Sequence, residues 1–241
     1  MALNKEVFKT RTLTAIVFAA VMLAGLFSKW LFIPLLITIM IGCLKEYIKL
    51  RRLANSRESI IIVLATAVVY IVLPLVLLGR MGYTELKHSA SGHLLQFNSF
   101  LYSPLLPCAI IFSIWINDTM AYITGSFIGK TPFSIISPKK TWEGTIGGAI
   151  LCVVVISLLS RMIPMAKEIP LWFWIILSTL CAVFGTMGDL YESYLKRKAG
   201  VKDSGNIMPG HGGFLDRFDS LLFASTAVFA FLLLLNAILP A

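Results

Sequence analysis

The sequence predicts an all-α protein, a polytopic bundle of about seven transmembrane helices with the N-terminus in the cytoplasm. Of its 241 residues, 58% are hydrophobic and 14% are charged, whereas soluble globular chains are about 45–50% apolar and about 25% charged. This composition excludes an ordinary soluble domain and a disordered chain. The basic residues lie between long apolar runs, so the net charge of +9 does not predict a nucleic-acid partner. Four cysteines in apolar stretches, without metal-ligand spacing, are expected to be small core residues: Cys43, Cys108, Cys152 and Cys181.

Seven apolar segments approach the length of about 17–25 residues that a helix needs to cross the hydrocarbon core. They are residues 12–27, 30–44, 59–78, 100–116, 145–163, 171–188 and 218–239. The first two are short and are expected to form a tilted hairpin. The first also resembles a signal peptide, but no small-x-small cleavage site follows it, so we predict a transmembrane helix.

The distribution of basic residues predicts the orientation. If the N-terminus is cytoplasmic and the spans alternate, 16 of the 21 lysines and arginines lie on the cytoplasmic side. The five on the other side are Lys29, Arg80, Lys87, Arg161 and Lys167. This bias agrees with the positive-inside rule and predicts a cytoplasmic N-terminus and an external C-terminus.

All five aspartates fall in the last two cytoplasmic segments or at the adjoining helix ends. They are Asp118, Asp189, Asp203, Asp216 and Asp219. Carboxylates beside apolar helix ends are costly, and they usually mark a functional site.

The first of these segments has features of a phosphate-binding loop. Asp118 is expected to end an apolar helix, and Gly125 and Gly129 allow close backbone approach. Ser137 and Thr141 precede the next helix and can cap it, which leaves N–H groups for an anion. Positive charge comes from Lys130, Lys139 and Lys140. Alone, this pattern is a weak signal.

The second segment carries more polar and charged side chains than the first. Four polar residues spaced three or four apart are expected on one helical face: Asp189, Glu192, Ser193 and Lys196. Asp216 and Asp219 share another face, and residues 209–213 force a sharp turn between the two helices. Clustered carboxylates beside lysines suit Mg²⁺ and phosphate oxygens, and two cations can clamp an in-line phosphoryl displacement.

The spacing of these residues resembles the signature of the phosphatidate cytidylyltransferase (CDP-diacylglycerol synthase) family. The downstream motif comprises Ser193, Leu195, Lys196, Arg197, Lys202, Asp203, Gly205, Pro209, Gly210, His211, Gly212, Gly213, Asp216, Arg217 and Asp219. The upstream motif comprises Asp118, Thr119, Ala121, Tyr122, Gly125 and most of residues 137–144. The resemblance covers roughly residues 117–220, and its one departure is Ser126, where the family leads us to expect a basic residue.

The resemblance implies transfer of the cytidylyl group of CTP to phosphatidate, with Mg²⁺ and a neighbouring K⁺. It divides the chain into N-terminal helices, residues 1–116, and a catalytic transmembrane region, residues 117–241. The expected catalytic residues are Asp189, Asp216, Asp219, Lys202, Arg217 and His211. The expected metal ligands are Asp189 and Asp216 first, then Asp219, then Asp118. The expected substrate-binding residues are Asp118, Lys139, Lys140, Thr141, Ser193, Lys196, Arg197, Asp203, Gly212 and Gly213.

Several individual roles stay open at this level. Ser193 binds phosphate or packs, and Arg217 contacts phosphate or pairs with Asp216 or Asp203. His211 orients a carboxylate, contacts phosphate or only forms the turn; it is not expected to act as a general base. Lys196 and its basic neighbours also fit a positive-inside anchor.

Three other functions compete with this interpretation: another CTP-using membrane enzyme, such as one making CDP-archaeol or a polyprenol kinase; an ion-coupled transporter; and a non-enzymatic scaffold. We expect a bacterial inner-membrane location, judging from the compact size and the lack of a targeting segment. The site is expected to face the cytoplasm. The lipid bilayer and a homodimer partner are expected contacts, and a nucleic-acid partner is not expected.

Overall fold

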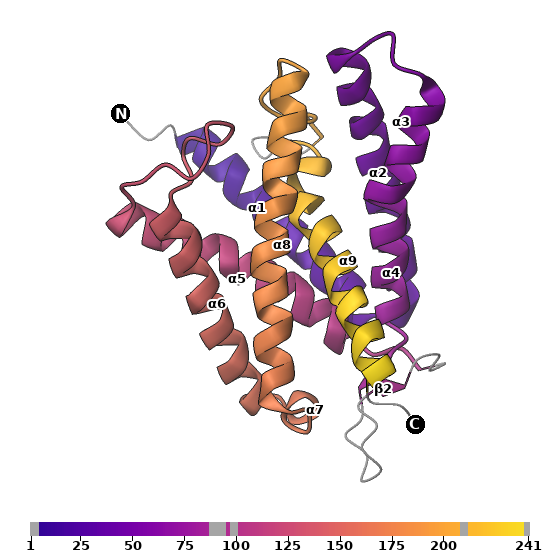
Figure 1. Cartoon of the computed structure of the whole chain (residues 1–241), viewed down its shortest axis with the longest axis vertical. Helices are drawn as coiled ribbons and strands as arrows, with labels where there is room; N and C mark the ends of the chain where they lie inside the picture. The colour runs from indigo at the N-terminus through magenta and orange to yellow at the C-terminus, as the bar shows by residue number, and fades with distance from the viewer. Residues whose placement is uncertain (1–4, 87–94, 97–100, 208–211, 239–241) are drawn as a thin grey trace. The chain divides into compact units, whose positions relative to one another are not determined.

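The computed structural model describes residues 5–86, 95–96, 101–207 and 212–238, with backbone alone for residues 5–11 and 95–96. The prediction of an all-α fold is confirmed (Figure 1). The helices are α1 (Lys5–Phe27), α2 (Lys29–Ala54), α3 (Ile60–Ala67), α4 (Leu73–Met81), α5 (Leu105–Ile128), α6 (Trp142–Met162), α7 (Pro164–Lys167), α8 (Leu171–Lys198) and α9 (Leu215–Ile238). A π-helical turn, η1 (Val68–Val72), joins α3 to α4, and β1 (Glu85–Leu86) pairs antiparallel with β2 (Leu95–Gln96).

Six helical segments in the described residues are long and apolar enough to cross a membrane. They are Lys29–Ala54, Ile60–Met81, Leu105–Ile128, Trp142–Met162, Leu171–Lys198 and Leu215–Ile238. The apolar part of α1, Thr12–Phe27, is shorter. The chain is therefore a multi-pass membrane protein, and the orientation of its N-terminus stays a prediction.

Every predicted apolar segment is largely helical, but several helices continue well beyond it. Helix α2 runs to Ala54, α5 to Ile128 and α8 to Lys198. The expectation that Asp118 ends a helix is wrong, because it lies inside α5. Hydropathy marks only the apolar part of a helix, whereas backbone hydrogen bonding continues through polar residues until a cap or breaker intervenes.

The chain forms two compact units, and the first comprises residues 1–73 and 191–219. Its core includes one face of α2, where Phe32, Cys43 and Tyr47 are fully buried. Helices α2 and α3 are joined by a short turn (Figure 1). Arg51 fastens that turn, since it pairs with Glu58 and donates a 2.7 Å hydrogen bond to the Tyr47 hydroxyl.

The second unit comprises residues 74–190 and 220–241. Helices α5 and α6 pack closely here, and a Cβ added at Gly148 would lie 2.7 Å from the Ala121 nitrogen. Thr124 Oγ1 donates to the Gly144 carbonyl at 3.0 Å, which ties the same two helices together. All four cysteines of the chain are free and buried, as predicted.

The boundary between the two units falls within α4, α8 and α9, so each unit is built from two separate stretches of the chain. The expected division between residues 116 and 117 falls inside α5. That division concerned catalytic role, so the assignment of residues 117–241 as the catalytic region stays a prediction.

Candidate active site

The last turns of α8 carry the first group of predicted site residues. Asp189, Glu192, Ser193 and Lys196 all lie in this helix, so the predicted helical spacing is confirmed. Glu192 is fully buried, and Ser193 is 8% exposed. A buried carboxylate in an apolar helix is costly unless a partner compensates its charge.

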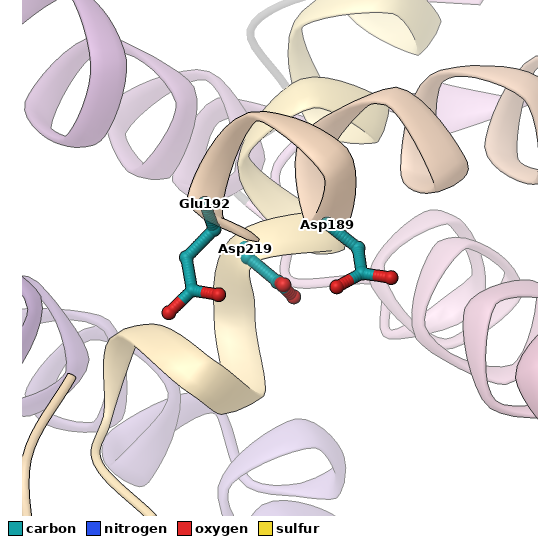
Figure 2. Close-up of side chains that lie close together, drawn as sticks. All are labelled: Asp189, Glu192 and Asp219. Atoms are coloured by element: carbon teal, nitrogen blue, oxygen red, sulfur yellow. The ribbon is translucent and has the colours of Figure 1, made fainter. Parts of the chain in front are cut away.

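Asp219 of α9 lies beside Glu192 within the first unit, and Asp189 precedes Glu192 by three residues in the same helix. Each of the three carboxylates offers one oxygen, and these oxygens lie within 4.8 Å of one another. Figure 2 shows the three side chains, two from α8 and one from α9. We call Asp189, Glu192 and Asp219 the carboxylate cluster.

Glu192 supplies the test of whether a cation suits this cluster. Its Oε2 pairs with Lys196, whereas its Oε1 is buried and has no hydrogen-bond partner among the described residues. Buried polar atoms in native proteins nearly always have a partner, and a bound cation would supply one for this oxygen. Hard oxygen donors of this kind are the ligands that Mg²⁺ prefers, so the residues present fit that ion.

Asp216 faces a different set of partners. Its Oδ1 accepts a 2.6 Å hydrogen bond from Lys196 Nζ, and its Oδ2 accepts from the backbone nitrogens of Ser204 (2.9 Å) and Gly213 (2.8 Å). Gly212 has a φ of +84°, and a Cβ there would lie 2.6 Å from Asp216 Oδ2. The turn before α9 therefore needs glycine at this position, both for its backbone conformation and for the close approach of Asp216.

The segment between α5 and α6 is a tight loop fastened by its own residues. Thr141 is the N-cap of α6 and accepts from the Gly144 nitrogen at 3.1 Å, so its expected capping role is confirmed. Glu143 accepts hydrogen bonds from Lys130 N (3.1 Å) and Thr131 Oγ1 (2.7 Å). An isolated antiparallel bridge also joins Pro132 to Thr141.

One ion pair connects the two predicted site segments within the second unit. Lys140, at the end of the loop, pairs with Asp189 of α8. Both side chains keep about a third of their surface exposed, at 30% and 28%. A lysine and a carboxylate are thus presented together where an anionic ligand and its counter-ion can reach them.

The remaining predicted residues differ in their exposure to solvent. Five are exposed in the structure: Asp118, Lys139, Arg197, Lys202 and Asp203. Arg217 is also exposed, and Gly213 is buried. His211 lies outside the described residues. The roles assigned to all of these stay predictions.

Sequence reasoning missed one acidic residue and underrated another. Glu46 of α2 received no role from the sequence, yet it is 5% exposed and accepts three hydrogen bonds. The signal was available, since it is the sole acidic residue between Glu6 and Glu58. Glu192 was expected on one helical face with Asp189 but was not among the expected metal ligands, although that spacing already placed the two carboxylates together.

Comparison with known proteins identifies the family. The model of the cytidylyltransferase family matches residues 96–235. A protein named phosphatidate cytidylyltransferase from Staphylococcus saprophyticus is 49% identical over 111 residues, which are 46% of this chain and 42% of that protein. One of the same name from Helicobacter pylori is 46% identical over 121 residues, 50% of this chain and 44% of that protein. Phosphatidate cytidylyltransferase 4, chloroplastic, from Arabidopsis thaliana is 44% identical over 117 residues, 48% of this chain and 29% of that protein.

The matched regions cover less than half the length of these curated relatives. Within this chain, the family match includes both predicted site segments and all three residues of the carboxylate cluster. It leaves out α1 to α4, and with them Glu46. The match covers more than half of the 241 residues, and the chain belongs to the cytidylyltransferase family.

Proposed function

We propose that the chain transfers the cytidylyl group of CTP to phosphatidate, giving CDP-diacylglycerol and pyrophosphate for phospholipid biosynthesis. The observation that carries the proposal is the carboxylate cluster, which lies inside the residues matched by the family. The names of the relatives from Staphylococcus saprophyticus and Helicobacter pylori support phosphatidate as the acceptor.

The proposed reaction is mainly an electrostatic problem. A phosphate oxygen of phosphatidate bonds to the α-phosphorus of CTP, and the bond from that phosphorus to the β-phosphate bridge breaks, releasing pyrophosphate. The nucleophile is already ionised near neutral pH, so the site needs no strong general base. It needs positive charge that offsets the repulsion between two anions and stabilises the leaving group.

We propose Mg²⁺ as the cofactor, held by Asp189 and Asp219 with Glu192 beside them. When bound, Mg²⁺ neutralises phosphate charge and stabilises the departing pyrophosphate. Asp216, which accepts hydrogen bonds from Lys196 and two backbone nitrogens, stays a predicted ligand. A neighbouring K⁺ rests only on the resemblance of the sequence motif.

Two lysines are proposed to contribute positive charge directly. Lys196 pairs with both Glu192 and Asp216, so it reduces the repulsion between carboxylates that lie close together. Lys140 pairs with Asp189, and it can turn to a phosphate oxygen once a cation takes over the aspartate charge. Both lysines are therefore held by ion pairs before substrate arrives.

We further propose that the site faces the cytoplasm of a bacterial inner membrane. The carboxylates lie near the last turns of α8 and the first turn of α9, where a lipid can arrive from the bilayer and CTP from water. The basic residues of the neighbouring segments agree with a cytoplasmic location. A homodimer is proposed from the resemblance alone, and no nucleic-acid partner is expected.

Labelled CTP tests the reaction directly. Purified protein receives CTP labelled at the α- or the γ-phosphate, with phosphatidate or a polyprenol as acceptor. The α-label should enter the lipid only with phosphatidate, and the γ-label should appear in pyrophosphate. EDTA should abolish the transfer and Mg²⁺ should restore it. Entry of the γ-label into polyprenol would identify a kinase instead, and transfer unaffected by EDTA would contradict the proposed metal.

A further inference from the structure

Glu46 is a buried carboxylate far from the predicted site segments in sequence. It lies in the membrane-spanning helix α2, outside the residues that match the family. At 5% exposure it has lost nearly all contact with solvent. Acidic residues in such helices are rare and costly, and they are usually held by specific partners.

Three donors surround this carboxylate, all within the first unit. Oε1 accepts from the Phe214 nitrogen at 3.0 Å, and Oε2 accepts from the Leu215 nitrogen at 2.9 Å. Ser204 Oγ lies 2.6 Å from Oε2. Leu215 is the first residue of α9, whose first N–H groups lack partners within the helix. Phe214 has no side-chain oxygen, so Glu46 supplies the capping acceptor and its negative charge faces the positive end of the helix dipole.

Two glycines make room for Glu46. A Cβ at Gly205 would lie 2.2 Å from Glu46 Oε1, and a Cβ at Gly213 would lie 2.2 Å from Glu46 Oε2. One turn earlier in α2, Gly42 lies against the Phe214 ring, 2.5 Å from where its Cβ would be. Gly42 and Glu46 together form a surface on α2 against which residues 213–215 pack.

Ser204 links this surface on α2 to Asp216. Its hydroxyl is 2.6 Å from Glu46 Oε2 and 2.9 Å from Asp216 Oδ2, and its single hydrogen serves one of them at a time. Asp216 follows Leu215 directly, and Asp219 lies one turn further along α9. The segment that carries both aspartates is therefore fastened to α2 through one buried carboxylate.

We propose that Glu46 is a positioning residue for the site: it holds the start of α9 so that Asp216 and Asp219 keep the geometry that binds the cation. This inference rests on the proposed function only for its activity readout, which is cytidylyl transfer. The hydrogen bonds that it concerns exist in the free protein and can be measured without turnover.

The test compares Glu46→Gln with Glu168→Gln, which makes the same chemical change at an exposed glutamate after α7. Hydrogen–deuterium exchange of the peptide covering residues 212–220 should be clearly faster in Glu46→Gln than in wild type, and unchanged in Glu168→Gln. The Mg²⁺ concentration for half-maximal turnover should rise, and kcat should fall about 30-fold, within the range of about 10–100-fold typical of residues that orient metal ligands. Exchange and Mg²⁺ dependence matching those of Glu168→Gln would overturn the proposal.

Ser204→Ala keeps the proposal testable if Glu46→Gln does not fold. It should speed exchange of the same peptide and raise the Mg²⁺ requirement, by less than Glu46→Gln does. In a double-mutant cycle, the effect of Ser204→Ala should largely disappear in the Glu46→Gln background, because the two residues act through one contact. Fully additive effects, or no change in exchange in Ser204→Ala, would contradict it. If wild type transfers no cytidylyl group, the proposed function fails, while the exchange data still decide the role of Glu46.

Discussion

Two glutamates fasten the two polar segments of this protein, and they do so over very different distances along the chain. Glu143 reaches back 12 or 13 residues to Thr131 and Lys130, and its bonds are at the surface. Glu46 reaches Ser204, Phe214 and Leu215 across 158–169 residues, and it is buried. The first contact closes a local loop, whereas the second joins parts of the chain that only folding brings together.

The difference has a physical consequence. The loop that Glu143 closes is also held by the Thr141 cap and a backbone bridge, so the loss of one bond leaves others. At the start of α9, the Phe214 and Leu215 nitrogens donate to the buried Glu46, and the Asp216 nitrogen donates to Ser204 Oγ, which itself contacts Glu46. Removing a partner from a buried carboxylate or its donors costs far more than removing an exposed one. We therefore expect the segment at residues 204–219 to be the more sensitive of the two.

The largest effect is expected from removing a carboxylate in the sensitive segment. Asp219→Asn should lower cytidylyl transfer by more than about 100-fold, because a cation ligand affects activity at least as strongly as the residues that orient it. The variant should still insert and purify. Transfer of the α-label from CTP to lipid measures the effect, with Glu168→Gln as the control. Near wild-type turnover in Asp219→Asn would show that Asp219 is not part of the active site. Asp216→Asn is expected to lose activity for the same reason.

Lys196→Met should have the next largest effect, and it should act on stability. Lys196 pairs with Glu192 and Asp216, whose side chains are 0% and 10% exposed. Loss of one partner from a buried ion pair costs about 3 kcal/mol of unfolding free energy. Denaturation in detergent should show this loss, and added Mg²⁺ should recover part of it. A variant as stable as wild type, with no response to Mg²⁺, would show that the three charges are not coupled.

Glu143→Gln should be milder, which would sharpen the contrast with Glu46. The amides of Lys130 and Thr131 should exchange faster, because they lose a charged acceptor. The KM for CTP should rise only a few-fold, and the Mg²⁺ requirement should stay the same. A collapse of turnover as large as that of Glu46→Gln would break the distinction between the local and the remote anchor.

The smallest effect is expected at Glu58, a half-buried glutamate held by Arg51 in the α2–α3 turn. The hydrogen bonds from Arg51 lower the pKa of Glu58 below its usual value. The pair therefore contributes stability above the ordinary pKa of a glutamate, and the contribution is lost as the pH falls through the lowered value. The small difference in unfolding temperature between wild type and Glu58→Gln should vanish in acid. A difference that grows in acid would contradict this.

The sequence predicted the helices well because long apolar runs report directly on membrane-spanning structure. It underestimated their polar ends, so Asp118 was expected at a helix end and lies within α5. Spacing along one helix correctly grouped Asp189, Glu192 and Lys196, since helical geometry is local. It could not show that Lys196 joins Asp216 or that Glu46 caps α9, because those contacts depend on packing between helices distant in sequence.

Binding of Mn²⁺ to the purified protein, followed by electron paramagnetic resonance, tests the proposed cation site most directly, because it needs neither CTP nor lipid. The signal of free Mn²⁺ should fall on addition of wild-type protein and return when Mg²⁺ competes. Asp219→Asn should abolish this binding, Glu46→Gln should weaken it, and Glu168→Gln should leave it unchanged. Binding that is equal in wild type and Asp219→Asn, or absent from wild type, would contradict a cation held by the carboxylates of α8 and α9.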